Sequence, residues 1–457
     1  MAGDGLAAFL REVAERLGPT GCVTDADVMA GQVVDWTGRW QGGTPAVLRP
    51  GSTEDVAAVV AAARRHAVAL VPQGGNTGLV GGSVPLAGEV VLDLRRLDHL
   101  GEVDLAAAQV TVGAGVTLAA VQAHVSPYGL EVAVDLASRD TATVGGMAAT
   151  NAGGVRVLRH GPMRAQVLGV EAVLGTGTVV TANLTGLVKD NTGYDLPGLL
   201  CGSEGTLAVL TALRLRLVPT PPARLAVMLA FPSLAAAVAA LPVLRSVSGL
   251  SAIEAVAGDA LQSVADHLGQ PLPVSVGEGW ALLVEVAGEP DRAAADLALA
   301  MDRLDRVTAS AAAADPAGLA RLWRWREAVP EAAAGLGLVH KADVTLPHAA
   351  LAAFDAEVRA VVDDVAPGAT TLVYGHLGDG NLHVNLVGPA ADDDRPIDAI
   401  LDLALRHGGS VSAEHGIGTA KRRWLVAQRG EAAVAAMRAI KEALDPGGIL
   451  NPHVLLP

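Results

Sequence analysis

The spacing of apolar and polar residues predicts a series of short strands and a few helices over the first 219 residues. An amphipathic pattern indicates one helix over residues 1–20, and Ser52 is a suitable cap for a second helix that runs to about residue 66. A third helix is expected over residues 118–125. The strands that we predict cover residues 67–72, 89–94, 109–113, 167–174, 178–181 and 207–217.

A proline-rich stretch at residues 219–222 marks a boundary, because proline ends a strand and suits a linker. Beyond it, strand and helix patterns alternate, which predicts an α+β arrangement for this half of the chain. The expected strands cover residues 226–230, 252–256, 281–286 and 339–346. The expected helices cover residues 234–244, 259–268, 291–304, 316–334 and 347–365. A length of 457 residues suggests two or three domains.

Composition narrows the class of protein. A net charge of −15 without a long block of Lys or Arg makes nucleic acid an unlikely partner. The N-terminus lacks the basic start and apolar core of a signal peptide, and no apolar run approaches the ~20 residues that span a bilayer. Cys22 and Cys201 lie far apart, which fits small buried hydrophobes in a reduced, cytoplasmic protein. Any membrane contact would then be peripheral, at the inner face.

Residues 73–83 form a glycine-rich loop between two predicted strands. A Rossmann fingerprint or a P-loop would lead into a helix, so this loop belongs to neither class. Successive backbone N–H groups in such a loop can bind an anion, and a pyrophosphate is a suitable guest. The alternative is a wide loop that only joins two strands. A second cluster of small residues, at 141–154, would let a planar ring lie against bare backbone, and a third cluster lies at 191–206.

Two histidines, His376 and His383, flank the turn signal Asp379-Gly380. If these two turn residues form a type I′ hairpin loop, His376 lies opposite His383 and Tyr374 lies opposite Asn385. Cross-strand partners have Cβ atoms roughly 4.5–5.5 Å apart, close enough for two imidazoles to share a metal ion. The alternative is a polar hairpin at the surface.

A third ligand is expected from Glu414, which precedes another histidine, His415. Two imidazoles and one carboxylate leave coordination positions open for a substrate, on zinc, iron or manganese. An imidazole titrates at about pH 6.5, which makes His415 the best candidate for a general base. The alternative for Glu414 is the cap of a helix that starts near Ile417.

Seven motifs together resemble one family. They read PQGGNTGLVGGS, VGGMAATNAGG, NTGYDL, GSEGTL, GHLGDGNLHVN, AEHGIG and LDPGGILNP. In this order they are similar to the FAD-linked D-2-hydroxy acid dehydrogenases of the vanillyl-alcohol-oxidase superfamily, which include D-lactate, glycolate and D-2-hydroxyglutarate dehydrogenases. The resemblance runs from about residue 45 to the end. It implies a two-part FAD-binding domain at 1–219, a ferredoxin-like substrate domain at 220–410 and a C-terminal helical segment at 411–457.

The resemblance also implies a cofactor site. It assigns FAD binding to Pro72, Gly74, Gly75, Asn76, Thr77, Gly78, Gly81, Gly82, Ser83, Thr143, Gly145, Gly146, Thr150, Asn151, Gly153, Gly205 and Asn451. Members that attach the flavin covalently often use a histidine after two glycines of the phosphate loop. Asn76 stands there in this chain, so we expect non-covalent FAD.

The implied reaction is the metal-assisted oxidation of a D-2-hydroxy acid to the 2-oxo acid, with hydride transfer to flavin N5. In the family, the residues matching His376, His383 and Glu414 hold a divalent ion, usually zinc, and the residue matching His415 is the base. Arg326 and Lys341 match carboxylate-binding positions, and Tyr374 and Asn385 are expected to contact the substrate as well.

One position departs from the family pattern. The 2-hydroxyglutarate enzymes carry a substrate-contacting threonine four residues after the arginine, where this chain has Pro330. Proline has no hydroxyl and would bend the helix. This puts hydroxyglutarate in doubt and leaves D-lactate or another 2-hydroxy acid open.

Two other functions remain open. One is a non-catalytic, FAD-binding electron-transfer subunit of a glycolate-oxidase-like complex, and the other is a protein that binds metal and ligand without a redox step. The electron acceptor of an enzyme would be a quinone, a cytochrome, an electron-transfer flavoprotein or oxygen. A homodimer is also compatible with the sequence.

Overall fold

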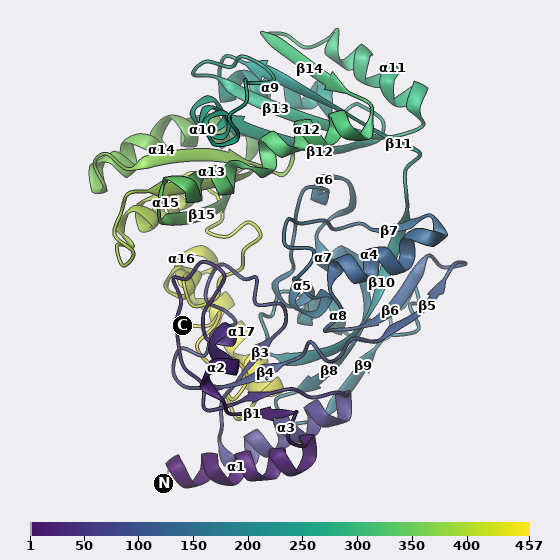
Figure 1. The fold of residues 1–457 in the computed structure, drawn as a ribbon, viewed down its shortest axis with the longest axis vertical. Coiled ribbons are helices and arrows are strands. Elements are labelled where there is room, and N and C mark those ends of the chain that lie inside the picture. The colour runs from purple at the N-terminus through teal and green to yellow at the C-terminus, as the bar shows by residue number, and fades with distance from the viewer. Residues whose placement is uncertain (1) are drawn as a thin grey trace. The chain divides into compact units, whose positions relative to one another are not determined.

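The computed structural model describes residues 2–457, which divide into two compact units (Figure 1). Unit 1 holds residues 2–154, 160–220 and 414–457, and unit 2 holds residues 155–159 and 221–413. The chain therefore leaves unit 1 and returns to it twice. None of the helices in this described range is both long and apolar enough to cross a membrane.

Unit 1 contains two sheets. The first has the strand order β1-β2-β4-β3, with β4 parallel to both of its neighbours. The second has the order β5-β6-β10-β8-β9 and is antiparallel, with β7 paired to the end of β10. The strands are β1 Cys22–Val23, β2 Val47–Leu48, β3 Leu70–Gln73, β4 Val90–Asp93, β5 Leu100–Asp104, β6 Gln109–Gly113, β7 Leu130–Val132, β8 Val167–Leu174, β9 Val179–Ala182 and β10 Ala208–Pro219.

The helices of unit 1 are mostly short. They are α1 Ala2–Leu17, α2 Ala26–Met29, η1 Ala30–Gln32, α3 Thr53–His66, α4 Leu118–Val125, η2 Ser126–Tyr128, α5 Val144–Thr150, α6 Val157–His160 (which crosses the boundary of the units), α7 Met163–Gln166, α8 Leu196–Leu200, η5 Arg422–Trp424, α16 Leu425–Arg429 and α17 Glu431–Leu444.

Helix α3 forms where its capping signals predict it. The Ser52 hydroxyl accepts a hydrogen bond from the N–H of Asp55 at 3.2 Å, and Ala67 ends the helix in the left-handed conformation. Its apolar face, which includes Val56 and Val59, packs into a core with α1, β3 and β4. The predicted strands and helices of this half are confirmed, and α4 and β6 have the predicted bounds.

Helix α5 was not predicted. Two adjacent glycines, Gly145 and Gly146, disfavour a helix by propensity. Packing decides here, because a Cβ on Gly145 would lie 2.6 Å from the Cβ of Ala114, so glycine lets the helix approach the end of β6. The Thr143 hydroxyl caps the helix by accepting a hydrogen bond from Gly146 N–H at 3.3 Å.

The C-terminal segment, yellow in Figure 1, belongs to unit 1 and joins its first sheet. Leu70 N–H donates to the carbonyl of Ile449, and Asn451 N–H donates to the carbonyl of Leu70, both at 2.8 Å. Residues 449–451 thus pair with the start of β3, the strand that leads into the glycine-rich loop.

Unit 2 is built on one antiparallel sheet with the order β14-β11-β13-β12-β16-β17-β15. Its strands are β11 Ala223–Phe231, β12 Leu250–Ala257, β13 Trp280–Gly288, β14 Ala309–Ala313, β15 Val339–Thr345, β16 Thr370–Gly375 and β17 Asn381–Val387. Its helices are α9 Leu234–Leu244, α10 Gly258–Leu268, α11 Pro290–Met301, α12 Pro316–Glu327, α13 Val329–Leu336, η3 His348–Ala350, α14 Leu351–Val365, η4 Leu377–Asp379 and α15 Arg395–Arg406.

One expectation for unit 2 was wrong in detail, and strand β14 and helix α15 were not predicted. The helix predicted over residues 316–334 is two helices, because α12 ends at Glu327 and Pro330 occupies the first turn of α13. Strand β14 was missed, since its alanine-rich sequence has little strand propensity and depends on pairing with β11.

Candidate active site

The hairpin of β16 and β17 has a register that differs from the predicted one. Tyr374 lies opposite His383 and Leu372 lies opposite Asn385, so the predicted pairs His376–His383 and Tyr374–Asn385 are wrong. The two-residue type I′ loop is wrong as well. Only Gly380 adopts positive φ, at 79°, whereas a type I′ turn needs positive φ at both central residues.

The loop is longer because a 3₁₀ turn, η4, fills it. The carbonyl of His376 accepts hydrogen bonds from the N–H groups of Asp379 and Asn381, at 3.1 and 3.2 Å. The true register differs from the predicted one by two residues. A shift by two keeps each side chain on the same face of the sheet, whereas a shift by one would reverse it.

The two histidines therefore still lie together. The ring centroids of His376 and His383 are 5.4 Å apart with an interplanar angle of 81°, and each residue is 6% exposed. Tyr374 packs against His383 with a centroid distance of 5.0 Å. The alternative of a hairpin at the surface is wrong, because every residue of β17 is buried.

A buried carboxylate that sequence reasoning missed, Glu254, stands behind His376. Its Oε1 lies 2.8 Å from His376 Nδ1, and its Oε2 accepts a hydrogen bond from Arg326 Nε, also at 2.8 Å. The Arg326 guanidinium lies 4.6 Å from the centroid of the Tyr374 ring. Burial acts to raise the pKa of Glu254, but its contacts with His376 and Arg326 outweigh this effect and hold that pKa below its usual range.

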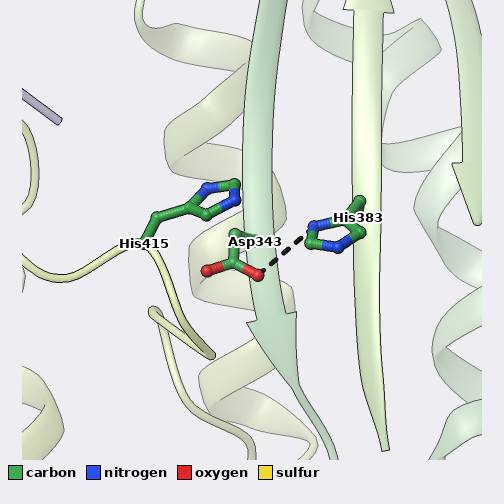
Figure 2. Close-up of side chains that lie close together, drawn as sticks. All are labelled: Asp343, His383 and His415. Atoms are coloured by element: carbon green, nitrogen blue, oxygen red, sulfur yellow. Dashed lines mark ion pairs between the residues drawn. The ribbon is translucent and has the colours of Figure 1, made fainter. Parts of the chain in front are cut away.

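A second carboxylate, Asp343, was also missed and stands behind His383. Figure 2 shows its carboxylate directed at the His383 ring, with Oδ1 3.4 Å from Nδ1. Asp343 Oδ1 also accepts a hydrogen bond from Asn381 Nδ2 at 2.9 Å, and Oδ2 accepts one from the N–H of Ala413 at 3.1 Å. The available signal for both carboxylates was a single acid in a strand whose residues are mostly buried.

The remaining predicted substrate-binding residues lie on the same sheet. Lys341 of β15 is paired with Asn385 of β17, and Asn385 Nδ2 donates to Tyr374 Oη at 3.3 Å. Arg326 is 7% exposed. Within the described residues, the two terminal nitrogens of Arg326 donate no hydrogen bond to protein, and Asn385 Oδ1 has no partner there either. These groups can serve a ligand.

The glycine-rich loop of unit 1 presents a run of backbone donors. Across residues 74–83, all of which the structure describes, no backbone N–H donates a hydrogen bond to protein. Gly74 and Gly75 are required by close packing, because a Cβ there would lie 2.2 Å from Thr143 Oγ1 or 1.9 Å from the Thr141 carbonyl. Ten successive donors without a protein acceptor suit the pyrophosphate of FAD.

Asn76 supports this loop with its side chain. Its Nδ2 donates to the carbonyls of Gly31 and Val34, and its Oδ1 accepts from Ser83 Oγ at 2.8 Å. Asn451 supports the end of the same loop, because its Nδ2 donates hydrogen bonds to the carbonyls of Gly82 and Glu204, both at 2.8 Å. All of the residues that the resemblance assigns to FAD belong to unit 1.

Replacing Gly75 with alanine is expected to lower thermal stability and FAD content together. The added Cβ would overlap the Thr141 carbonyl, and such overpacking costs about 1–3 kcal/mol. Thermal melting and bound flavin per chain are the measurements. Gly78→Ala is the control, since its Cβ would have no neighbour closer than 3.9 Å. Equal melting temperatures for the two variants would contradict the packing argument.

Glu414 and His415 belong to unit 1. Glu414 Oε2 accepts a hydrogen bond from Gly154 N–H at 3.0 Å. The carboxylate of Glu204 accepts hydrogen bonds from the N–H groups of Ile417 and Gly418, at 2.8 and 2.7 Å, and fixes the loop that follows. Burial raises the pKa of Glu204, and these N–H groups oppose the rise. Residue 417 is not helical, so the alternative of Glu414 as a helix cap is wrong.

Neither cysteine has the character of a nucleophile. Both thiols are free, and burial raises the pKa of Cys201 to about 11. Burial also raises the pKa of Cys22. A thiolate is therefore disfavoured at both positions.

Two sequence families match the chain: the FAD binding domain over residues 44–183, and the C-terminal domain of the FAD linked oxidases over residues 220–455. D-2-hydroxyglutarate dehydrogenase of Xanthomonas citri pv. viticola is 38% identical, and the alignment covers 92% of this chain and 91% of that protein. The mitochondrial D-2-hydroxyglutarate dehydrogenase of Bos taurus is 36% identical, over 99% of this chain and 84% of that protein.

Solved structures share the fold at lower identity. A p-cresol methylhydroxylase with substrate bound has a TM-score of 0.81 and 15% identity, and the match covers 98% of this chain and 96% of that chain. The 4-ethylphenol oxidase from Gulosibacter chungangensis has a TM-score of 0.77 and 20% identity, over 99% of this chain and 98% of that chain. The predicted fold class is confirmed.

Proposed function

The chain belongs to the FAD-linked oxidases and is an FAD-dependent dehydrogenase of a D-2-hydroxy acid, and we propose that His376, His383 and Glu414 hold a divalent metal ion that assists this oxidation. Zinc is the ion that we expect. His415 is proposed as the general base, and Arg326 and Lys341 as the cations that bind the substrate carboxylate.

The observation that carries this proposal is the arrangement on the unit 2 sheet. Each of the two histidines has a carboxylate at its Nδ1, Glu254 for His376 and Asp343 for His383. Metal-ligating histidines usually have such a partner, which leaves Nε2 for the ion. Arg326 lies at the same carboxylate as His376 and keeps its terminal nitrogens available. Glu254 thus contacts both the proposed metal ligand His376 and the proposed carboxylate binder Arg326.

Chain connectivity supports the roles of Glu414 and His415. The N–H of Ala413 donates a hydrogen bond to the carboxylate of Asp343. Glu414 and His415 are the next two residues of the chain. Two extended residues span at most roughly 7 Å. The carboxylate and the imidazole are therefore tethered to the segment that already contacts the partner of His383.

The chain's own residues have separate tasks in the proposed reaction. Arg326 and Lys341 orient the carboxylate, and Tyr374 and Asn385 contact the substrate beside them. His415 accepts the proton of the hydroxyl group as the 2-oxo acid forms. When bound, FAD would supply the acceptor for the hydride of the α-carbon, and a divalent ion would lower the pKa of the hydroxyl group.

The substrate that we propose is D-lactate or a D-2-hydroxyglutarate-like acid. The names of the bovine and Xanthomonas relatives support D-2-hydroxyglutarate. Pro330, in the first turn of α13, supplies no hydroxyl group and favours a substrate that does not need one.

The test is anaerobic flavin reduction. D-lactate, D-2-hydroxyglutarate and glycolate are added separately to metal-loaded protein, and the flavin absorbance is followed. We expect bleaching with at least one D-2-hydroxy acid and none with its L-enantiomer. No bleaching with any 2-hydroxy acid would contradict the enzyme and favour a non-catalytic electron-transfer subunit. Acceptors are then compared, including a quinone, a cytochrome and an electron-transfer flavoprotein.

Acid precipitation is expected to release all flavin into the supernatant. Asn76 has no nucleophilic nitrogen, and its side-chain amide forms hydrogen bonds with Gly31, Val34 and Ser83. Absorbance at 450 nm in supernatant and pellet measures the outcome. Flavin that stays with the washed pellet would show a covalent bond and overturn this prediction.

A further inference from the structure

We infer that Glu254 is a positioning residue that sets the geometry of two functional groups at once, the proposed metal ligand His376 and the proposed carboxylate binder Arg326. This inference rests on the proposed function and assigns a role to a residue outside the predicted site. Glu254 lies on β12, is 1% exposed, and engages one partner with each oxygen at 2.8 Å.

Burial of the Glu254 carboxylate would be energetically unfavourable without His376 and Arg326 as partners. The other residues of β12 are buried except Leu250 at its start, and five of the buried ones are apolar: Ala252, Ile253, Ala255, Val256 and Ala257. An ionised carboxylate loses several kcal/mol of solvation in such surroundings unless donors or cations compensate. Packing of the sheet would be satisfied by an apolar side chain of similar volume. The presence of an acid at position 254 is therefore explained by its contacts with His376 and Arg326.

Each of the two contacts selects one state of its partner. The contact with Glu254 Oε1 favours the proton on Nδ1 of His376, which leaves the Nε2 lone pair for a metal ion. The contact with Oε2 uses Nε of Arg326, which leaves both terminal nitrogens for a bidentate bond to a carboxylate. A 2-hydroxy acid carries its hydroxyl group and its carboxylate on adjacent carbons. One rigid residue between the two recognition groups fixes the spacing that such a substrate requires.

The neighbouring strand offers a matched control. Glu285 of β13 is also buried, and its oxygens accept hydrogen bonds from Arg224 at 3.1 Å and Trp323 at 2.8 Å. The register pairs Glu254 with Leu283, so Glu285, two residues further, faces the same side of the sheet. Its partners are not proposed to bind metal or substrate. Glu285 therefore reproduces the burial and pairing of Glu254 without its function.

Glu254→Gln is the informative variant. A carboxamide offers one acceptor and one donor, whereas His376 and Arg326 both present N–H groups, so one of the two contacts is lost. We expect the affinity of the chelator-treated protein for Zn²⁺ alone, measured by calorimetry, to fall about 10–100-fold. KM for the D-2-hydroxy acid rises as well. Glu285→Gln lowers the melting temperature similarly but changes Zn²⁺ affinity and KM less than about threefold.

Glu254→Asp is the rescue variant, which also serves if Glu254→Gln does not fold. It keeps two acceptor oxygens on a shorter side chain, and we expect Zn²⁺ affinity and KM between those of wild type and Glu254→Gln. Glu254 variants that match Glu285→Gln in Zn²⁺ affinity and KM would overturn the positioning role alone. Wild-type Zn²⁺ binding that His376→Ala leaves unchanged would overturn the proposed metal centre, and this inference with it.

Discussion

Replacing His415 with alanine is expected to lower kcat for the D-2-hydroxy acid by about 10²–10⁴-fold, the usual contribution of a positioned general base. The substrate still binds, because the carboxylate-binding residues Arg326 and Lys341 are unchanged. The rate of anaerobic flavin reduction in a stopped-flow experiment measures the effect.

Controls separate loss of the base from loss of the site. FAD and zinc content should equal those of wild type, since His415 is not a proposed ligand. His453→Ala removes another imidazole from the C-terminal segment of unit 1, one that is half-exposed, and should leave the rate unchanged. An unchanged rate of flavin reduction in His415→Ala would refute the proposed role.

Arg326→Met is expected to have the second large effect, on substrate affinity and on stability. Loss of a charge-assisted contact to the carboxylate costs about 1.5–3 kcal/mol, which corresponds to a KM roughly 10–150-fold higher. The variant also leaves Glu254 without one partner, and breaking a buried ion pair in this way costs about 3–5 kcal/mol. Steady-state kinetics and denaturant unfolding give the two quantities.

Arg324 is the matched control on the same helix. It forms an exposed ion pair with Glu331, with two contacts of 2.7 Å, and such surface pairs contribute about 0–1 kcal/mol. Arg324→Met should leave KM and stability close to wild type. If Arg326→Met behaves like Arg324→Met in KM, Arg326 does not bind the substrate carboxylate.

Local signals in the sequence were sufficient for much of the fold. Ser52 and the apolar spacing after it specified α3, and the change of pattern after residue 219 specified the alternating elements of unit 2. Pro330 specified the interruption between α12 and α13, although the sequence alone did not show that two separate helices result. Each of these signals acts within a few residues of its effect.

The hairpin of β16 and β17 shows what local sequence signals do not predict, namely the register of the two strands. Alternation along the strands determined that His376 and His383 share one face, because side chains repeat with a period of two. The register itself depended on a 3₁₀ turn and on Gly380, and was wrong by two residues when read from Asp379-Gly380 alone.

The sequence by itself determined most of the elements, the glycine-rich loop and the common face of the two histidines, since these follow from short-range backbone preferences. Only the tertiary structure revealed Glu254 and Asp343. Glu254 is 122 positions from His376 in the chain, and they meet because β12 and β16 are neighbours in the sheet. Strand order is set by the packing of the whole unit, so no local pattern encodes which acid lies behind which histidine.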